Sequence, residues 1–313
     1  MKLSLVVPCY NEAENVAAFQ DAAIQAFNGC GYDFEIVFVD DGSKDATLHE
    51  LRKLHKEQRC PVKVVSFSRN FGKEAAIYAG LKHTSGDFVS LIDADLQQRP
   101  EIVRDMIQIL EEKPEYDVVA AYQDRRGESK VLSFFKKSFY RVINGLSNIS
   151  LKSDASDFRT FRRSVADSII ALGEYHRFSK GIFAWVGYNT CFIPYVACER
   201  AAGTSKWNFR KLFNYAIDGI IGYSTKPLRI ATFLGCTSAI AAFIYLIVVV
   251  LQKLISGIDI PGYATIIVLI LFLGGMQLFC IGIIGEYVGR TFEQSKERPV
   301  YIAKEVLNYD TEE

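Results

Sequence analysis

The sequence predicts an α/β fold with a mostly parallel, doubly wound sheet, followed by two helices that cross a membrane. Three observations support this prediction. Short apolar runs alternate with polar-faced, helix-length stretches up to about residue 121, a polar cluster follows each of the first four runs, and two long uncharged stretches lie near the C-terminus. Alternation of strand-length and helix-length segments is typical of a parallel sheet covered by helices.

The first 121 residues contain five runs of strand length and three polar-faced stretches of helix length. The expected strands are Leu3–Val7, Glu35–Val39, Val62–Phe67, Phe88–Ile92 and Val118–Ala121, and the expected helices are Glu14–Phe27, Ala46–Gln58 and Glu101–Glu112. In such sheets ligands bind outside the carboxyl ends of the strands. The polar clusters Cys9–Glu12, Asp40–Ser43, Ser68–Lys73 and Asp93–Gln97 all follow strands. We therefore expect one site at that edge.

Two uncharged stretches, Ile230–Leu251 and Tyr263–Ile284, each run for about 22 residues. This length matches a hydrocarbon core about 30 Å thick. A charge at a helix centre would cost roughly 2.5–3.5 kcal/mol on insertion, and neither stretch contains one. The alternative is a pair of buried core helices, but a chain of this size rarely buries two such helices on all sides. The pattern favours a transmembrane hairpin over residues 230–286.

Basic residues set the expected orientation of this hairpin. They flank both outer ends of the spans and are Lys226, Arg229, Arg290, Lys296 and Arg298. By the positive-inside tendency both ends are cytoplasmic. The chain also begins with too few apolar residues for a signal-peptide core, which keeps its first part in the cytoplasm. The expected organisation is a cytoplasmic domain over residues 1–229, the hairpin over 230–286 and a cytoplasmic tail over 287–313.

Two further segments, near residues 130–149 and 206–229, interleave aromatic and basic side chains. Amphipathic helices of this composition suit a membrane surface. Ordinary helices that pack on the sheet are the alternative. We expect interfacial helices in both places.

Composition narrows the function classes. Formal net charge is zero, so a broadly basic surface for nucleic acid has no support. The seven cysteines form no CxxC pair and have no His partners at ligand spacing. This argues against structural zinc and a disulfide framework, and fits a reducing compartment.

Asp93-Ala94-Asp95 follows the fourth apolar run. Because residues i and i+2 of an extended chain point to the same face, both carboxylates can reach one cation. Oxygen ligands of this kind suit Mg²⁺ or Mn²⁺ and a bound diphosphate, and Gln97 could add a neutral oxygen. A plain turn or a helix cap is the alternative for such a triplet.

Asp40 and Asp41 follow the second run. One carboxylate there can accept hydrogen bonds from a base or ribose, and Asp41 can instead cap the helix that starts near Ala46. The segment Pro8-Cys9-Tyr10-Asn11-Glu12 offers an aromatic face and a carboxylate to a nucleoside, although any strand-to-helix turn could look the same.

Four motifs give these clusters a specific resemblance. VVPCYNE, VDDGSKD, SRNFGKEAAIYAGL and DADLQQRPE occur in the order and spacing of the GT-A domain of family 2 glycosyltransferases. Asp157-Phe158-Arg159, the stretch 199–206 and GEYVGRTFEQSKERPVYI resemble one branch, the polyprenyl-phosphate glycosyltransferases, and within it the bactoprenol type. Dolichol-phosphate mannose synthases are related. The resemblance covers nearly the whole chain and implies a Rossmann-like GT-A fold.

The resemblance also implies roles for individual residues. Pro8, Tyr10, Glu12 and Asp40 would hold the nucleoside, with Asp41, Arg69 and Lys73 near the nucleotide-sugar, and Asp93, Asp95 and Gln97 would hold metal and diphosphate. Arg200 and Lys206 would neutralise phosphate charge, and Arg125, Arg126 and Arg200 would bind the lipid phosphate, a task for which the forked donors of guanidinium are suited. A solvated loop is the alternative for Arg125 and Arg126. Arg69 and Lys73 could instead only support the fold.

Asp157 resembles the position proposed as general base in family 2 enzymes, which invert the anomeric centre by in-line displacement. A phosphate monoester has a second pKa near 6, so a lipid phosphate is largely ionised at pH 7 and hardly needs deprotonation. Asp157 could instead orient the acceptor or the sugar, or cap a turn. The roles of general base, orienting group and turn cap all stay open for Asp157.

The implied activity is transfer of one sugar, with glucose from UDP-glucose as first choice, to undecaprenyl phosphate at the bacterial inner membrane. Single transfer is favoured because the chain has no QxxRW-type motif and only two spans. N-acetylhexosamine, mannose and aminopentose donors are alternatives. A membrane-anchored glycosyltransferase with a soluble acceptor and a non-catalytic scaffold are the rival classes. The resemblance also implies a homo-oligomer, with a tetramer as one option, and no nucleic-acid partner.

Overall fold

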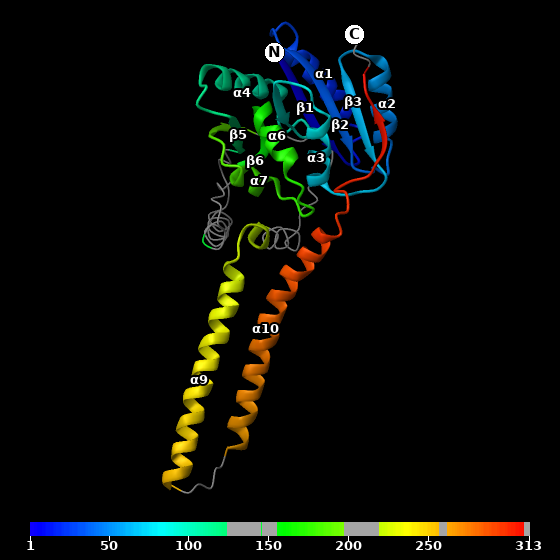
Figure 1. The fold of residues 1–313 in the computed structure, drawn as a ribbon. Coiled ribbons are helices and arrows are strands. Elements are labelled where there is room, and N and C mark those ends of the chain that lie inside the picture. The colour runs from blue at the N-terminus through cyan, green and yellow to red at the C-terminus, as the bar shows by residue number, and fades with distance from the viewer. Residues whose placement is uncertain (124–144, 146–154, 197–218, 257–261, 310–313) are drawn as a thin grey trace.

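The computed structural model describes residues 1–123, 145, 155–196, 219–256 and 262–309. Figure 1 shows a sheet-and-helix domain from which two long helices extend side by side. The expected segments 130–149 and 206–229 lie mostly outside the described residues. Of the second, residues 219–223 and 226–229 are helical.

Eight strands form one mixed sheet in the order β7-β5-β6-β4-β1-β2-β3-β8. Four strand pairs are parallel, namely β1 with β2 and β4, β2 with β3, and β5 with β7. The strands are β1 (Lys2–Cys9), β2 (Asp33–Asp40), β3 (Val62–Phe67), β4 (Phe88–Leu91), β5 (Val118–Gln123), β6 (Ala155–Arg162), β7 (Thr190–Tyr195) and β8 (Ala303–Leu307). The five expected strands and the mostly parallel sheet are confirmed.

Helices cover both faces of the sheet, because its inner strands are apolar on both sides. In β1, Leu5 packs with Phe19 and Met106 on one face, whereas Val6 packs with Ile77 and Ile182 on the other. The helices of the first face are α1 (Val16–Phe27), α2 (Thr47–Glu57) and α4 (Pro100–Glu112), and those of the second are α3 (Lys73–His83), α6 (Arg163–Ala171) and α7 (Ser179–Trp185). The three expected helices are those of the first face.

Strand β6 lies antiparallel between β4 and β5. Its pairing with β4 places Arg159 opposite Leu91 and Phe161 opposite Val89. When this register is continued beyond the paired residues, Asp157 falls opposite Asp93. The inserted strand therefore brings a residue from far along the chain to the carboxyl edge of β4.

The two long helices are α9 (Lys226–Ser256) and α10 (Tyr263–Ser295), which extend beyond the expected spans. Both are long and apolar enough to cross a membrane, and none of their apolar windows is buried inside the protein. The alternative of two buried core helices is therefore wrong. At the end nearest the domain, the Tyr287 hydroxyl on α10 donates to the Ser224 carbonyl just before α9, at 2.6 Å.

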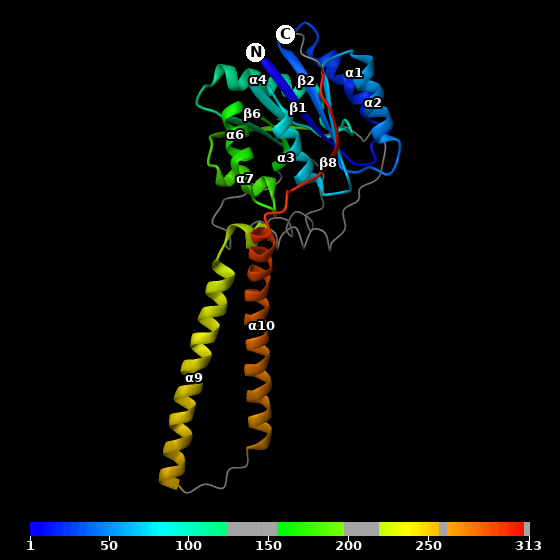
Figure 2. The same ribbon diagram turned by 45° about the vertical axis from the view of Figure 1, so that its right-hand side comes forward.

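The chain after α10 returns to the sheet. Residue 287, the expected start of the C-terminal tail, still lies within α10. Strand β8 pairs antiparallel with β3 and covers this edge (Figure 2). Tyr301 stacks on Phe67 with ring centroids 4.9 Å apart, and Arg52 forms a 2.5 Å ion pair with Glu305. The outer backbone groups of β3 are thereby paired, and β8 becomes the last strand on this side of the sheet. The tail is thus an integral part of the sheet.

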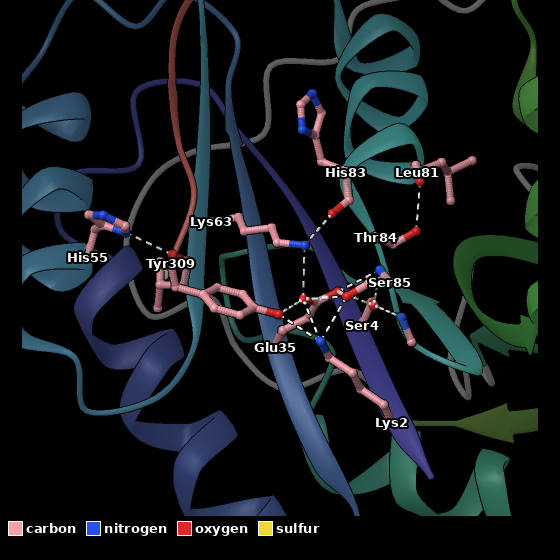
Figure 3. Close-up of polar contacts among 12 residues, drawn as sticks. Lys2, Ser4, Glu35, His55, Lys63, Leu81, His83, Thr84, Ser85 and Tyr309 are labelled. Carbon is pink, nitrogen blue, oxygen red and sulfur yellow. Dashed lines mark hydrogen bonds and ion pairs between the residues drawn. The ribbon is translucent and has the colours of Figure 1, made fainter. Parts of the chain in front are cut away.

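Tyr309, just beyond β8, reaches a buried carboxylate near the start of β2 (Figure 3). The Glu35 side chain is 0% exposed and lies 3.2 Å from the ammonium groups of both Lys2 and Lys63. Ser4, Ser85 and Tyr309 donate hydrogen bonds to it. This cluster, which we call the Glu35 cluster, links the first strand, the sheet interior and the C-terminal tail.

Candidate active site

The polar clusters after β1 and β2 lie together at the carboxyl edge of the sheet, as expected. The Asn11 amide donates to the Ser43 hydroxyl, and the Lys44 amide donates to the Asn11 side-chain oxygen, both at 2.9 Å. The Glu12 amide donates to the Thr47 hydroxyl at 2.9 Å. Pro8, Tyr10 and Glu12 are half-buried around this junction. Their contact with a nucleoside stays a prediction.

Asp40 holds the turn that follows β2. One of its oxygens accepts from the Ser43 amide at 3.0 Å and the other from the Ser66 hydroxyl at 2.8 Å, and only 1% of the residue is exposed. These bonds tie β2 to β3 at the edge of the site. A nucleoside contact of Asp40 also stays a prediction.

Asp41 fixes the loop between β3 and α3. Its carboxylate accepts hydrogen bonds from the Phe71 amide at 2.6 Å and from the Gly72 amide at 3.0 Å. Burial raises the pKa of Asp41, and the neighbouring charge of Asp40 adds to the rise. The alternative of a cap for α2 is wrong. That helix has no side-chain cap at Ala46. The reason is geometric, since the carboxylate is already bonded to the amides of the β3–α3 loop.

Gly42 lies where this loop crosses the β2–α2 turn. Its φ is +65°, and a Cβ atom there would lie 2.4 Å from the Arg69 carbonyl carbon. Both the left-handed conformation and the contact with another backbone require glycine.

A Gly42→Ala substitution is expected to destabilise the protein and to displace the loop that contains Arg69. Gly29→Ala is the matched control, because Gly29 has φ +72° but open space around it. Left-handed strain alone costs roughly 1–2 kcal/mol, and overpacking adds roughly 1–3 kcal/mol. Thermal unfolding should show Gly42→Ala less stable than Gly29→Ala by about 2 kcal/mol. Equal losses would mean that the crossing relaxes freely.

Lys73, Asp93 and Asp157 form the charged centre of the site. The Lys73 ammonium lies 2.6 Å from an Asp93 oxygen and 3.5 Å from an Asp157 oxygen. Burial alone lowers the pKa of Lys73, but the two carboxylates outweigh it and raise that pKa above its usual value. The lysine is therefore charged, and it bridges the first residue of the acidic triplet and the expected catalytic aspartate.

Asp157 is an ionised carboxylate in a cationic setting. Burial by itself raises its pKa, but the charges of Lys73, Lys180 and Arg159 outweigh burial and lower the pKa below its usual value. Its second oxygen, Oδ1, is buried and has no hydrogen-bond partner in the described part of the chain. A buried carboxylate oxygen without a donor is unusual and is typical of a functional site. This oxygen can accept from a bound substrate.

The acidic triplet can contribute two carboxylates to a metal ion. The Gln97 amide donates to Asp95 at 3.2 Å, and Leu96 between them has a left-handed φ of 56°. Backbone strain of this kind is often found at binding sites. The side chain of Gln98, which is 6% exposed, accepts from the Asp93 amide at 3.0 Å. The described residues contain no group of three His, Cys, Asp or Glu side chains placed for a metal. A metal held here would take its other ligands from water, Gln97 and the diphosphate of a donor.

Several residues of the site were missed by the sequence interpretation. Glu74 follows Lys73 on α3 and accepts hydrogen bonds from the Ser179 amide, at 2.8 Å, and from its hydroxyl. Burial, with the charge of Asp157, raises the pKa of Glu74 to about 7. Lys180, next to Ser179, is near enough for its charge to lower the pKa of Asp157. A lone lysine at the start of the apolar stretch 181–186 is the signal that could have identified it.

The remaining expected site residues divide into two groups. Arg69 lies at the rim, exposed, with its guanidinium 4.0 Å from the centroid of the Phe71 ring. Arg125, Arg126, Arg200 and Lys206 lie outside the described residues. Their roles stay predictions.

Comparison with known proteins agrees with this geometry. Glycosyl transferase family 2 matches residues 4–170, and the GtrB C-terminal hairpin matches residues 226–291. A bactoprenol glucosyl transferase of Shigella phage SfV is 41% identical over 97% of this chain and 98% of its own length. A prophage bactoprenol glucosyl transferase homologue of Escherichia coli K12 is 41% identical over 98% and 99%.

A solved structure shares the fold at lower similarity. It is the glucosyl-3-phosphoglycerate synthase of Mycobacterium tuberculosis, in complex with Mn²⁺, UDP and phosphoglyceric acid, with 20% identity and a TM-score of 0.52 over 70% of this chain and 76% of that one. The GT-A fold that the motifs implied is confirmed. The chain belongs to glycosyl transferase family 2, is a glycosyltransferase, and carries the GtrB type of C-terminal hairpin.

Proposed function

We propose that the enzyme transfers one sugar, with glucose from UDP-glucose as the first candidate, to a polyprenyl phosphate at the cytoplasmic face of the bacterial inner membrane. The observation that carries this proposal is the charged centre of Lys73, Asp93 and Asp157 in one chain with two unburied apolar helices. Relatives at 41% identity are named bactoprenol glucosyl transferases, which supports the lipid acceptor and the glucosyl group.

The donor would lie along the carboxyl edge of the sheet. Pro8, Tyr10, Glu12 and Asp40 would surround its nucleoside, with Asp41 holding the loop of Arg69 in place. Asp93, Asp95 and Gln97 would hold a divalent metal, Mg²⁺ or Mn²⁺, which when bound supplies positive charge to the leaving diphosphate. Lys73, already 2.6 Å from Asp93, adds a second positive charge at the same place.

The reaction would be a direct displacement with inversion. An oxygen of the lipid phosphate attacks the anomeric carbon, and the bond from that carbon to the diphosphate breaks, with its electron pair leaving on the diphosphate. A phosphate monoester is largely ionised at pH 7, since its second pKa is near 6. Asp157, with its lowered pKa, is a weak base. Its role here is therefore to orient the acceptor or the sugar through its buried, unbonded oxygen.

Four basic residues complete the proposal. Arg125, Arg126 and Arg200 would bind the phosphate of the lipid, and Arg200 with Lys206 would neutralise the charge of the diphosphate. We further propose that both chain ends are cytoplasmic and that the enzyme is a homo-oligomer, with a tetramer as one option. A monomeric mass in mild detergent would contradict the last of these points.

A transfer assay with purified full-length protein tests the proposed function. It would present radiolabelled UDP- and GDP-sugars to undecaprenyl phosphate in the presence of Mg²⁺ or Mn²⁺. We expect one sugar per lipid from one preferred donor, and loss of transfer when the metal is chelated. Undecaprenol, which lacks the phosphate, is the matched control acceptor and should remain unlabelled. No lipid product from any donor, despite nucleotide binding, would overturn the proposal.

A further inference from the structure

A cavity of about 360 Å³ lies where the catalytic domain meets the cytoplasmic end of α10. Its walls come from four parts of the chain: the β3–α3 loop, the first turn of α3, the segment before α7, and α10 with Val300 from the segment that follows it. Both the β3–α3 loop, through Arg69 and Phe71, and α10, through Arg290, line it. Of the basic residues that line this cavity, the proposed function involves only the loop of Arg69.

The cavity is held together by docking of the segment before α7 onto α10. The Tyr175 amide donates to the Gln294 side chain at 2.8 Å, and that side chain donates back to the Gly173 carbonyl at 3.1 Å. His176 pairs with Glu293. These contacts join the catalytic domain to the hairpin, so any molecule in the cavity would touch both.

Positive charge dominates the lining. Arg69, Arg177 and Arg290 contribute guanidinium groups from three different segments, and Glu74 is the carboxylate among the lining residues. Glu74 is turned toward Ser179, which donates two hydrogen bonds to it. Guanidinium groups that converge from separate segments form the kind of site that binds a phosphate group.

Two of these arginines have no ion-pair partner in the described part of the chain. Arg69 donates to the Asn70 carbonyl at 2.9 Å. Arg177 donates to the Leu172 carbonyl at 2.6 Å and lies 4.1 Å from the centroid of the Tyr78 ring. Carbonyls and aromatic rings orient a guanidinium without neutralising it. Arg290 pairs with Glu286 one turn away, at 3.4 Å. The cavity therefore retains positive charge that an anion can balance.

The surface of α10 below the cavity is apolar. Phe272, Phe279 and Ile283 lie on the same side of this helix as Arg290, at 3.6 residues per turn. The two phenylalanines are 59% and 57% exposed, and Ile283 is half-buried. Arg290 lies about 10 Å beyond Ile283 along the axis, at 1.5 Å per residue. The headgroup layer begins at the edge of the hydrocarbon core, and long basic side chains reach into it. A lipid whose tail lies on this helix surface would have its phosphate at the level of the cavity.

We propose that this cavity binds the phosphate of a membrane lipid and that the bound lipid bridges the catalytic domain and α10. The ligand is a lipid phosphate, which an anionic phospholipid or the polyprenyl phosphate acceptor can supply. In the second case the inference rests on the proposed function. In the first it is independent of that function.

The test measures lipid binding to the full-length protein in neutral detergent micelles by native mass spectrometry. The probes are two matched pairs, phosphatidylglycerol against diacylglycerol and undecaprenyl phosphate against undecaprenol, with inorganic phosphate as a separate competitor. Arg290→Gln removes the guanidinium group that α10 contributes to the cavity, and Arg69→Gln removes the one from the β3–α3 loop. Arg229→Gln is the matched control, since Arg229 is exposed at the cytoplasmic end of α9 and does not line the cavity.

We expect the protein to retain a phosphate-bearing lipid, and each cavity variant to bind it roughly tenfold more weakly, as expected for loss of a charged hydrogen bond. The Arg229→Gln protein should bind as the unmodified protein does. Retention of undecaprenyl phosphate alone assigns the site to the acceptor, and retention of both phosphate lipids assigns it to headgroups in general. Both outcomes support the proposal.

Three results would overturn it. These are equal retention of lipids with and without phosphate, unchanged binding by both cavity variants, and displacement of the lipid by inorganic phosphate at equal concentration. The assay contains no sugar donor, so a failure of sugar transfer does not affect its outcome. Melting curves of the variants show that each is folded before binding is compared.

Discussion

An Asp157→Asn enzyme is expected to transfer sugar roughly 10²–10³-fold more slowly than the unmodified enzyme. The substitution keeps the size of the side chain and removes its charge. Lys73 would then pair with Asp93 alone, and the charges of Lys180 and Arg159 would lose the anion that they face. Since catalysis depends on groups held in place before the reaction, this rearrangement and the loss of the carboxylate that orients the acceptor or the sugar both slow transfer.

The pH profile separates an orienting role from base chemistry. Because the pKa of Asp157 is lowered, its ionisation cannot produce a rate change near neutrality. We expect kcat/KM to rise through a pKa near 6, which belongs to the lipid phosphate, in both the unmodified enzyme and the variant. The ratio of the two rates should therefore stay constant from about pH 5.5 to pH 8.

Asp167→Asn is the control for this comparison. Asp167 is on α6, with a side chain 63% exposed and a 3.9 Å contact to Arg163, so its loss should leave transfer unchanged. The rise of kcat/KM near pH 6 could disappear in Asp157→Asn and remain in Asp167→Asn. In that case Asp157 would be the general base, and the orienting role would be wrong.

The polar clusters at the carboxyl edge of the sheet were predictable because their positions depend on local sequence patterns. Each cluster follows its own strand, and parallel strands end at the same edge. Asp157 was different. It was singled out by resemblance, and its place opposite Asp93 results from β6 inserting between β4 and β5. A pairing between residues so far apart in sequence leaves no periodic signal.

Helix α3 was not predicted because it lacks a polar face in its middle. Residues 75–81 are all buried between the sheet and its neighbours, so the usual 3.6-residue alternation is absent. The buried role of Glu35 was hidden for another reason. Its partners Lys2, Lys63, Ser85 and Tyr309 are scattered over the chain, and only the return of the tail brings the last of them to β2.

The Glu35 cluster makes the largest predicted contribution to stability. Burial by itself raises the pKa of Glu35, but hydrogen bonds from Ser4, Tyr309 and Ser85, with the charge of Lys63, lower it from 4.5 to about 2. A lowering of this size corresponds to about 3 kcal/mol. A lowered pKa means that this stability is fully present above about pH 4.5 and is lost as the pH falls through 2.

A Glu35→Gln protein is therefore expected to unfold more easily by about 3 kcal/mol at pH 7, since Lys2 and Lys63 would lose their shared carboxylate. For a domain of this size the loss corresponds to roughly 6–12 °C in Tm. Glu57→Gln is the control, because Glu57 is exposed on α2 and should change Tm little.

The difference between the Glu35→Gln and unmodified proteins should shrink as the pH is lowered from 5 toward 2, because both then carry a neutral side chain at this position. Hydrogen exchange gives a second readout. Since Tyr309 anchors the chain just after β8, the β8 amides should exchange faster in the variant than in the Glu57→Gln control. A Tm shift that is the same at pH 3 and pH 7 would show that packing, and not the buried charge, stabilises this part of the sheet.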